Sequence, residues 1–288
     1  MNVSAYRSVI STLEKKTQLF DPTFVATREG QYGQQVDFNT VYGTNTLACP
    51  TVTPGLLKDT QSDVIIKLPT TGDYVGIAST SPNDTALGTG CRSVYIEGLS
   101  DLFAKQNETV ATDGQNVVLT TKKFFRINRL VASSQGSNTN YAIQGMQNQV
   151  SPNIGTIYCG EKTSFTAGVP SSIYSTIQPD VGWSRQALCS FPTGYFPIMK
   201  SVAAAPGGGR MVEFSINFCF GFGQGLIKTF NWYGFQQVAA LDFYIGGIYY
   251  VGGDLLVTAL ADGGAIPAMI KLEFMLVRND LLTEVGAI

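Results

Sequence analysis

The residue types that most often carry catalysis are sparse in this 288-residue chain, and histidine is missing altogether. Histidine is the usual general base near neutral pH and the commonest zinc ligand in proteins. Serine–histidine–acid and cysteine–histidine machinery is therefore impossible. Lysine, tyrosine and paired-carboxylate mechanisms survive in principle, and spacing alone does not exclude a carboxylate pair of the glycosidase kind.

The carboxylates are scattered among turns rather than grouped. Asp84, Asp113, Asp254 and Asp262 each lie in a segment that also contains Gly or Asn. The Gly-rich segments 206–209 and 221–225 are followed neither by a helical pattern nor by Gly-Lys-Ser/Thr, so they are typical of turns or bulges rather than phosphate loops. We therefore expect no catalytic residue, no cofactor and no metal site, and a protein that is not an enzyme.

The five cysteines are odd in number, widely spaced, and contain no Cys-x-x-Cys pair. Zinc sites and disulfide frameworks need closer or paired cysteines. The pattern favours small, reduced, buried side chains at Cys49, Cys91, Cys159, Cys189 and Cys219.

One basic cluster stands out, with aromatic and aliphatic residues between its charges. It contains Lys122, Lys123, Arg126 and Arg129, interleaved with Phe124, Phe125 and Ile127. Such a cluster contacts a partner, such as a genome, an acidic membrane or a neighbouring subunit, or it is a solvated strand face whose opposite face is core. We predict that these four residues contact a partner or lie exposed, and that they have no catalytic role.

The composition is typical of a surface that neighbours cover, or of a protein that works outside the cytosol. Charged residues make up 14% of the chain, against about 25% in an average globular protein, while 44% are hydrophobic and the net charge is −2. There is no arginine-rich arm to bind nucleic acid strongly, and no apolar stretch reaches the ~20 residues of a membrane span. Residues 1–20 lack the apolar core of a signal peptide, so we expect synthesis in a cytosol.

Helical spacing is convincing only at the start of the chain. Tyr6, Val9, Ile10 and Leu13 share a face, and Ser4 is a plausible N-cap. The residues that follow mix Gly, Gln, Asn and Thr with single aromatics. We expect an N-terminal helix and extended arm over residues 1–54, containing one short strand near 36–41.

Residues 55–288 show strand signals almost throughout and predict a β body. Alternating or short apolar runs lie at 63–68, 72–78, 92–97, 116–121, 124–131, 211–220, 226–233, 238–245, 247–251, 255–260 and 269–277, with short strands near Ile157 and Ile173. Loops are expected around Pro192 and Pro197, and a polar excursion over 132–153. Strands about ten residues apart are typical of an antiparallel sandwich or barrel. A division into two barrels near 178–209 is compatible with the pattern.

Aromatic residues concentrate in the last third of the chain. They are Phe214, Phe218, Phe220, Phe222, Phe230, Trp232, Tyr233, Phe235, Phe243, Tyr244, Tyr249 and Tyr250. Many share the parity of neighbouring Val and Ile, which favours a thick β core. A carbohydrate-binding platform with exposed rings stays open as an alternative.

In organisation the chain resembles the jelly-roll capsid proteins of viruses and phages, most of all over Arg210–Asn279. A dense series of strands there ends on the long apolar run Met269–Val277. The resemblance implies one or two eight-stranded barrels in a self-assembling icosahedral shell. Its subunits would form trimers or pseudo-hexamers with other virion proteins, assembled in a host cytoplasm. A phage tail, spike or decoration protein, and a carbohydrate-binding or pore-forming β protein, remain as alternatives.

Overall fold

The protein is built from antiparallel β-strands. The computed structural model describes residues 36–45, 55–56, 66–136, 153–179, 182–206, 212–222, 226–234, 239–241, 252–261 and 268–278. Within these ranges there is no helix, and every pair of neighbouring strands runs antiparallel. The predicted mostly-β, antiparallel barrel or sandwich class is confirmed.

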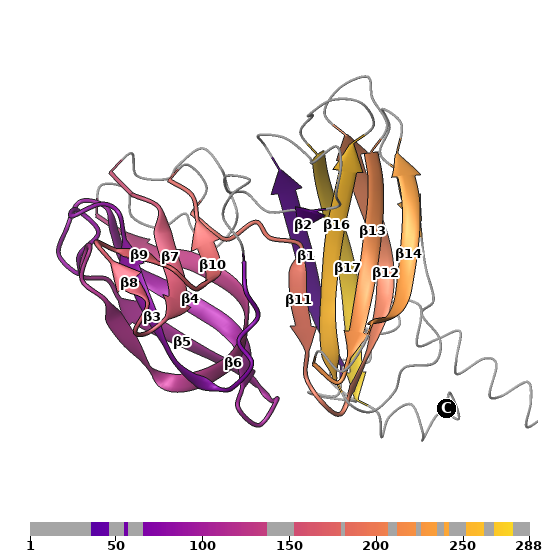
Figure 1. Ribbon diagram of the computed structural model, residues 1–288, viewed down its shortest axis with the longest axis horizontal. Helices are drawn as coiled ribbons and strands as arrows, with labels where there is room; N and C mark the ends of the chain where they lie inside the picture. Colours follow the sequence, from indigo (N-terminus) through magenta and orange to yellow (C-terminus); the bar gives the residue numbers. More distant parts are fainter. Residues whose placement is uncertain are drawn as a thin grey trace, which may run out of the picture.

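Two facing sheets form a sandwich (Figure 1). The first has the order β1 (Val36–Asn45), β17 (Ala268–Arg278), β12 (Tyr195–Pro206), β15 (Ala239–Leu241). The second has the order β11 (Leu188–Phe191), β16 (Gly253–Ala261), β13 (Val212–Phe220), β14 (Leu226–Gly234).

Apolar residues at alternate positions fill the space between these two sheets. In β13, Val212, Phe214 and Ile216 are buried and the residues between them are half-buried. They join a core that includes Phe274 of β17, whose ring centroid lies 5.2 Å from that of Phe191. Because side chains alternate between the two faces of a β-strand, one face of each strand lies in the core, as the alternation in 211–220 predicts.

A second body consists of one curled sheet of six strands. Its order is β10 (Ile173–Ile177), β7 (Ile157–Glu161), β3 (Asp73–Ser79), β6 (Val118–Gln135), β4 (Cys91–Ser100), β5 (Lys105–Ala111). A small hairpin of β8 (Phe165–Thr166) and β9 (Val169–Pro170) lies beside it. The long strand β6 pairs with β3 through residues 118–124 and with β4 through residues 124–135. We call this unit the inserted body, because of how the chain enters and leaves it.

The inserted body interrupts a single strand position of the sandwich. The short strand β2 (Gly55–Leu56) pairs with β16 at Ala259 and Thr258, and β11 continues the same row from Leu256. Between them, the Val257 N–H donates to the Ala187 carbonyl at 2.9 Å. The chain thus begins one edge strand of the sandwich, builds the inserted body, and returns to complete that strand.

Two parts of the sandwich differ from expectation. The short strand expected near 36–41 within the span 1–54 is β1, which has ten residues and pairs with β17 along its whole length. The loop expected near Pro192 is the turn between β11 and β12, whereas Pro197, also expected in a loop, lies within β12. Pro197 is tolerated there because it pairs with Leu276 on one side only, while β15 pairs with residues 202–204.

In the inserted body, β5 was missed because its sequence, KQNETVA, is polar, and it forms an exposed edge. The strand expected at 63–68 is only an isolated bridge at Ile66 among its described residues. The predicted N-terminal helix and the strand at 247–251 lie outside the described residues.

Candidate functional site: the basic segment of β6 and the junction it forms

The basic cluster of β6 divides into exposed and buried members. Lys122 and Lys123 are exposed, Arg129 is half-buried, and Arg126 is only 3% exposed. The exposure of these side chains changes along β6 because the strand enters the space between the two bodies at residue 124. Phe124 and Ile127 belong to the core of the inserted body, whereas Phe125 and Arg126 contact residues of the sandwich.

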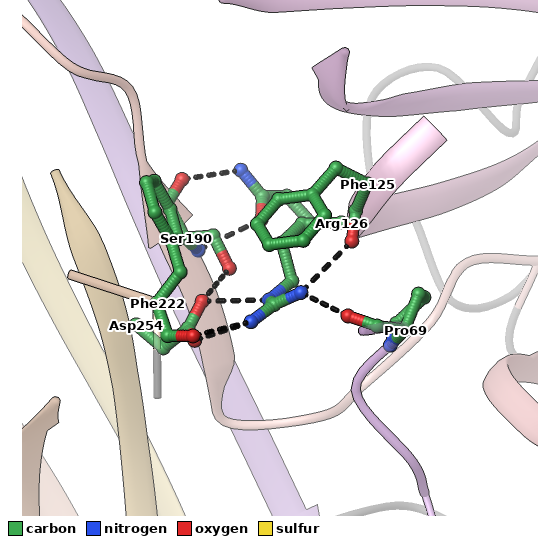
Figure 2. A network of polar contacts seen from close by, with 7 residues as sticks. Pro69, Phe125, Arg126, Ser190, Phe222 and Asp254 are labelled. Atoms are coloured by element: carbon green, nitrogen blue, oxygen red, sulfur yellow. Dashed lines mark hydrogen bonds and ion pairs between the residues drawn. The ribbon is translucent and has the colours of Figure 1, made fainter. Parts of the chain in front are cut away.

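Arg126 forms a two-pronged ion pair with Asp254 of β16 (Figure 2). Its Nε donates to Oδ1 and its Nη2 to Oδ2, both at 2.9 Å. Nη1 donates to the carbonyls of Pro69 and Phe125, and Nη2 also reaches the Phe222 carbonyl at 3.5 Å. All five guanidinium N–H groups therefore have acceptors, which is the condition for burying an arginine at tolerable cost.

Asp254 is held from the sandwich side as well. It is 1% exposed and lies opposite Ser190 in the β11–β16 ladder, so the Ser190 hydroxyl donates to its Oδ1. Asn128 of β6 bonds the Ser190 backbone twice, donating to its carbonyl at 2.9 Å and accepting from its N–H at 2.8 Å. Charge-assisted, two-pronged pairs fix orientation as well as distance.

Two phenylalanine rings, Phe125 and Phe222, lie against the arginine, and a third, Phe103, packs on both of them. The Phe125 ring centroid lies 4.0 Å from the Arg126 Cζ, and Phe103 stacks on Phe222 with centroids 4.7 Å apart and planes 13° from parallel. Phe103 and Phe222 both have positive φ, 58° and 55°. That conformation costs a bulky residue on the order of 1–3 kcal/mol. The two rings that stack here therefore both come from strained backbone positions, in two separate loops.

Gly252 makes room for that arrangement. Its φ is +66°, and a Cβ there would lie 2.7 Å from the Phe222 ring. Only glycine suits this position, because both the backbone conformation and the close ring exclude a side chain.

These contacts have a structural role. Every donor of the guanidinium is engaged, and both members of the ion pair are buried inside the chain. We call the contact of Arg126, Asp254, Ser190 and Asn128 the junction. It locks the inserted body onto the sandwich, and it directs Arg126 toward the chain's own sandwich rather than toward solvent.

The other three basic residues have different surroundings. Arg129 pairs in register with Glu97 across β4–β6, and its Cζ lies 5.7 Å from the Trp183 ring centroid. Burial raises the pKa of Glu97, and the Arg129 charge opposes that rise. Lys122 donates to the Asn107 carbonyl at 2.7 Å, and the Lys123 ammonium lies 5.8 Å from the Tyr74 ring centroid.

A second buried carboxylate lies within the inserted body. Asp84 is fully buried and accepts hydrogen bonds from the Ser79 hydroxyl, from Cys91 N–H at 2.5 Å and from Gly155 N–H at 2.9 Å. Burial raises the pKa of Asp84, and these three donors oppose the rise. It ties together the loop at 80–90, the start of β4 and the segment before β7.

Both buried aspartates were visible in the sequence as scattered turn carboxylates, and their roles were missed. For Asp254 a signal exists, since it is the one charge at the start of the apolar run Leu255–Leu260. For Asp84 the sequence carries no such signal, because its donors come from positions 5, 7 and 71 residues away.

The described cysteines form no disulfide. Cys91, Cys159 and Cys189 are buried, and Cys219 is half-buried. Burial raises the pKa of Cys91 to about 12 and that of Cys159 well above its ordinary range, so both are inert thiols at neutral pH. Cys49 lies outside the described residues.

Within the described part of the chain, no group of His, Cys, Asp and Glu residues is placed to hold a metal ion. None of the described segments is a helix long and apolar enough to cross a membrane.

No protein-family model matches this sequence, and no curated protein matches it. Among solved structures, that of the infectious bursal disease virus Gx strain aligns at 9% identity over 85% of this chain and 75% of that chain, with a TM-score of 0.16. The VP2 subviral particle of the same virus aligns at 7% identity over 84% and 76%, with a TM-score of 0.17. Its T=1 particle aligns at 11% identity over 87% and 80%, with a TM-score of 0.12. These weak neighbours are viral particles, and TM-scores this low carry no weight for the fold or function of this chain.

Proposed function

We propose that this chain is a structural subunit of a virus or phage shell, and that its sandwich is the jelly roll that builds the shell. The observation that carries the proposal is strand order. Counted along the chain without β2 and the inserted body, the eight sandwich strands form two sheets of order 1-8-3-6 and 2-7-4-5. This interleaving supports the assignment to the double-sheet jelly roll, an arrangement that recurs in viral capsid domains and in lectins.

The sandwich also has the properties that repeated packing requires. Its core is continuous between the sheets, so it behaves as a rigid body that loses little conformational freedom on association. With 14% charged residues and a net charge of −2, repulsion between copies is weak. We infer a homo-oligomer, either a trimer or a pseudo-hexameric capsomer, that joins other virion proteins in an icosahedral particle assembled in the host cytoplasm.

The inserted body adds one unit to a single jelly roll. Its single six-stranded sheet has the order β10-β7-β3-β6-β4-β5, which is not that of a second jelly roll. The inserted body interrupts an edge strand and is held by the junction. We therefore expect it to keep a fixed position on the shell and to cover one part of its surface. Lys122 and Lys123, exposed on β6, are the basic residues we propose to contact a neighbouring subunit.

No catalytic role follows from this proposal, and the test is self-association without turnover. Size-exclusion chromatography with light scattering, near neutral pH and at moderate salt, should show defined multiples of the 31.0 kDa chain or closed particles. A strictly monomeric species that hydrolyses a sugar or an ester with saturation would contradict the proposal.

A further inference from the structure

A polar cavity of about 270 Å³ lies at the side of the inserted body away from β5. The segment 67–71 and the neighbouring strands β3, β7 and β10 supply most of its lining. The side chains that give it its chemistry are Lys67, Asp73, Tyr74, Glu161, Lys162 and Tyr174. We call it the polar cavity.

The charges of the polar cavity are balanced and partly paired. Lys162 forms an ion pair with Asp73, at 2.7 Å to Oδ2 and 2.9 Å to Oδ1. That hydrogen bond is the main reason that the pKa of Asp73 is lowered, so the carboxylate stays ionised. Lys67 donates to the Ser172 hydroxyl at 3.1 Å, and Glu161 is exposed. Two ammonium groups thus face two carboxylates.

Aromatic rings and hydroxyls complete the lining. Tyr74 is 38% exposed and has the ammonium groups of Lys123 and Lys162 each 5.8 Å from its ring centroid. Burial raises the pKa of Tyr174 to about 12, so its hydroxyl stays protonated and can donate. Thr70, Thr71 and Ser172 add groups that both donate and accept.

We propose that the polar cavity binds a neutral, hydroxyl-rich ligand, namely a single sugar ring. Hydroxyls donate to Asp73 and Glu161 and accept from Lys67 and Lys162, so one polyol matches both kinds of group. A phosphate or other anion would face two carboxylates, and a cation would face two ammonium groups. The volume lies just under the roughly 300–1,000 Å³ of pockets for drug-sized ligands, which suits one ring rather than a long chain.

The wall of the polar cavity is fixed before any ligand arrives. Pro69 lines the cavity, and its carbonyl accepts a hydrogen bond from Arg126 at the junction. Phe124, another lining residue, is fully buried in the core of the inserted body. A site held in place in this way loses less freedom on binding. This proposal is independent of the shell function.

Ligand-observed NMR and titration calorimetry on the full chain would test the proposal. The neutral probes are the methyl glycosides of galactose, glucose and mannose, with the free sugars alongside. Inorganic phosphate and N-acetylneuraminic acid are the charged comparators. The variants are Tyr74→Ala and Glu161→Gln, with Leu87→Ala and Asp101→Asn as controls at exposed positions outside the cavity lining.

We expect at least one neutral sugar to bind saturably, and each cavity variant to weaken its Kd about tenfold, the loss of one net hydrogen bond or ring contact. The controls should leave Kd within about twofold. Binding of the methyl glycoside indicates the end of a glycan, and binding of the free sugar alone indicates a soluble sugar. The proposal is overturned if no neutral sugar saturates, if phosphate or the anionic sugar binds more tightly, or if cavity and control variants behave alike.

Discussion

The sandwich and the inserted body fill their interiors with different chemistry. Among the side chains that the structure describes, the fully buried polar residues of the sandwich are Ser190 and Asp254, and both belong to the junction. The interior of the inserted body is much richer in such groups. Apart from Arg126 at the junction, it buries Ser79, Asp84, Thr112, Thr120, Gln135, Ser175, Thr176, Ser184 and Gln186.

This difference separates two sources of stability. The sandwich depends on apolar area, which is non-directional and tolerates small changes of shape. The inserted body has an apolar core of its own and depends in addition on hydrogen bonds such as those of Asp84. Losing one partner of such a bond leaves a buried polar group unsatisfied. Polar substitutions should therefore affect the inserted body strongly, and small apolar ones should affect the sandwich weakly.

The junction should give the largest effect, since it joins both bodies. Arg126→Met leaves the buried Asp254 carboxylate without its cation, and we expect a loss of about 3–5 kcal/mol in the free energy of unfolding. The measurement is urea unfolding followed by circular dichroism. Lys122→Met, an exposed change on the same strand, is the matched control and should cost less than about 0.5 kcal/mol.

The double variant Arg126→Met/Asp254→Leu sharpens this result. Replacing both charges removes the unpaired carboxylate, so most of the lost stability should return. A double variant no more stable than the single one would show that the junction acts through shape rather than through charge.

Asp84→Asn probes the hydrogen-bonded interior of the inserted body with almost no change in volume. The amide nitrogen cannot accept from a backbone N–H, so either Cys91 or Gly155 loses its acceptor, and we expect a loss of about 1–3 kcal/mol. Urea unfolding at pH 7 measures it. A change below about 0.5 kcal/mol would remove the contrast between the two bodies.

The same variant should change the pH dependence of stability. The pKa of Asp84 in the folded protein lies above its ordinary value of 3.8. Between those two values the folded state binds more protons than the unfolded state, so this group makes stability fall as the pH rises through that window. Asp84→Asn should abolish that slope, and an unchanged slope would assign it to another group.

Ile270→Val makes the complementary small change in the sandwich. Ile270 is fully buried between the two sheets. Losing one methylene there should cost about 0.5–1.5 kcal/mol, less than the isosteric change at Asp84. Thermal unfolding of the two variants side by side gives the ranking, and the reverse order would contradict it.

The smallest effect on stability should come from the exposed lysines. Lys122→Gln/Lys123→Gln should leave the free energy of unfolding within about 0.5 kcal/mol, because both side chains are exposed. If they contact a neighbouring subunit, the salt dependence of self-association should change. Sedimentation velocity over a range of NaCl concentrations measures this, and identical profiles for variant and parent would leave the pair as a solvated strand face.

The sequence predicted the strands whose apolar alternation is strong and local. β13 and β17 were found within one or two residues of their ends, because residues 211–220 and 269–277 carry that pattern. It missed β5, whose polar sequence reflects its place at an exposed edge of the sheet. It also missed β12, whose prolines lie where the strand is paired on one side only. In both cases the deciding partner is another strand, which local patterns do not contain.

The candidate site shows the same limit more sharply. The basic cluster was visible in the sequence, but its members on one strand differ in exposure: Lys123 is exposed and Arg126 is buried. The partner that decides this, Asp254, lies 128 residues further along the chain. No local signal marks that pairing, since it depends on how the inserted body lies against the sandwich.

We propose that the sandwich is sufficient for assembly, and that Lys122 and Lys123 of the inserted body add only a salt-sensitive contact. The ladder offers a direct test, because Leu56 pairs with Thr258 and Leu188 with Leu256, leaving one position opposite Val257. Deleting residues 58–187 joins Leu57 to Leu188 and should restore one continuous edge strand. Electron microscopy of the deletion variant beside the full chain should show the same oligomers or particles, lacking only the inserted body. A folded deletion variant that stays monomeric while the full chain assembles would contradict the account.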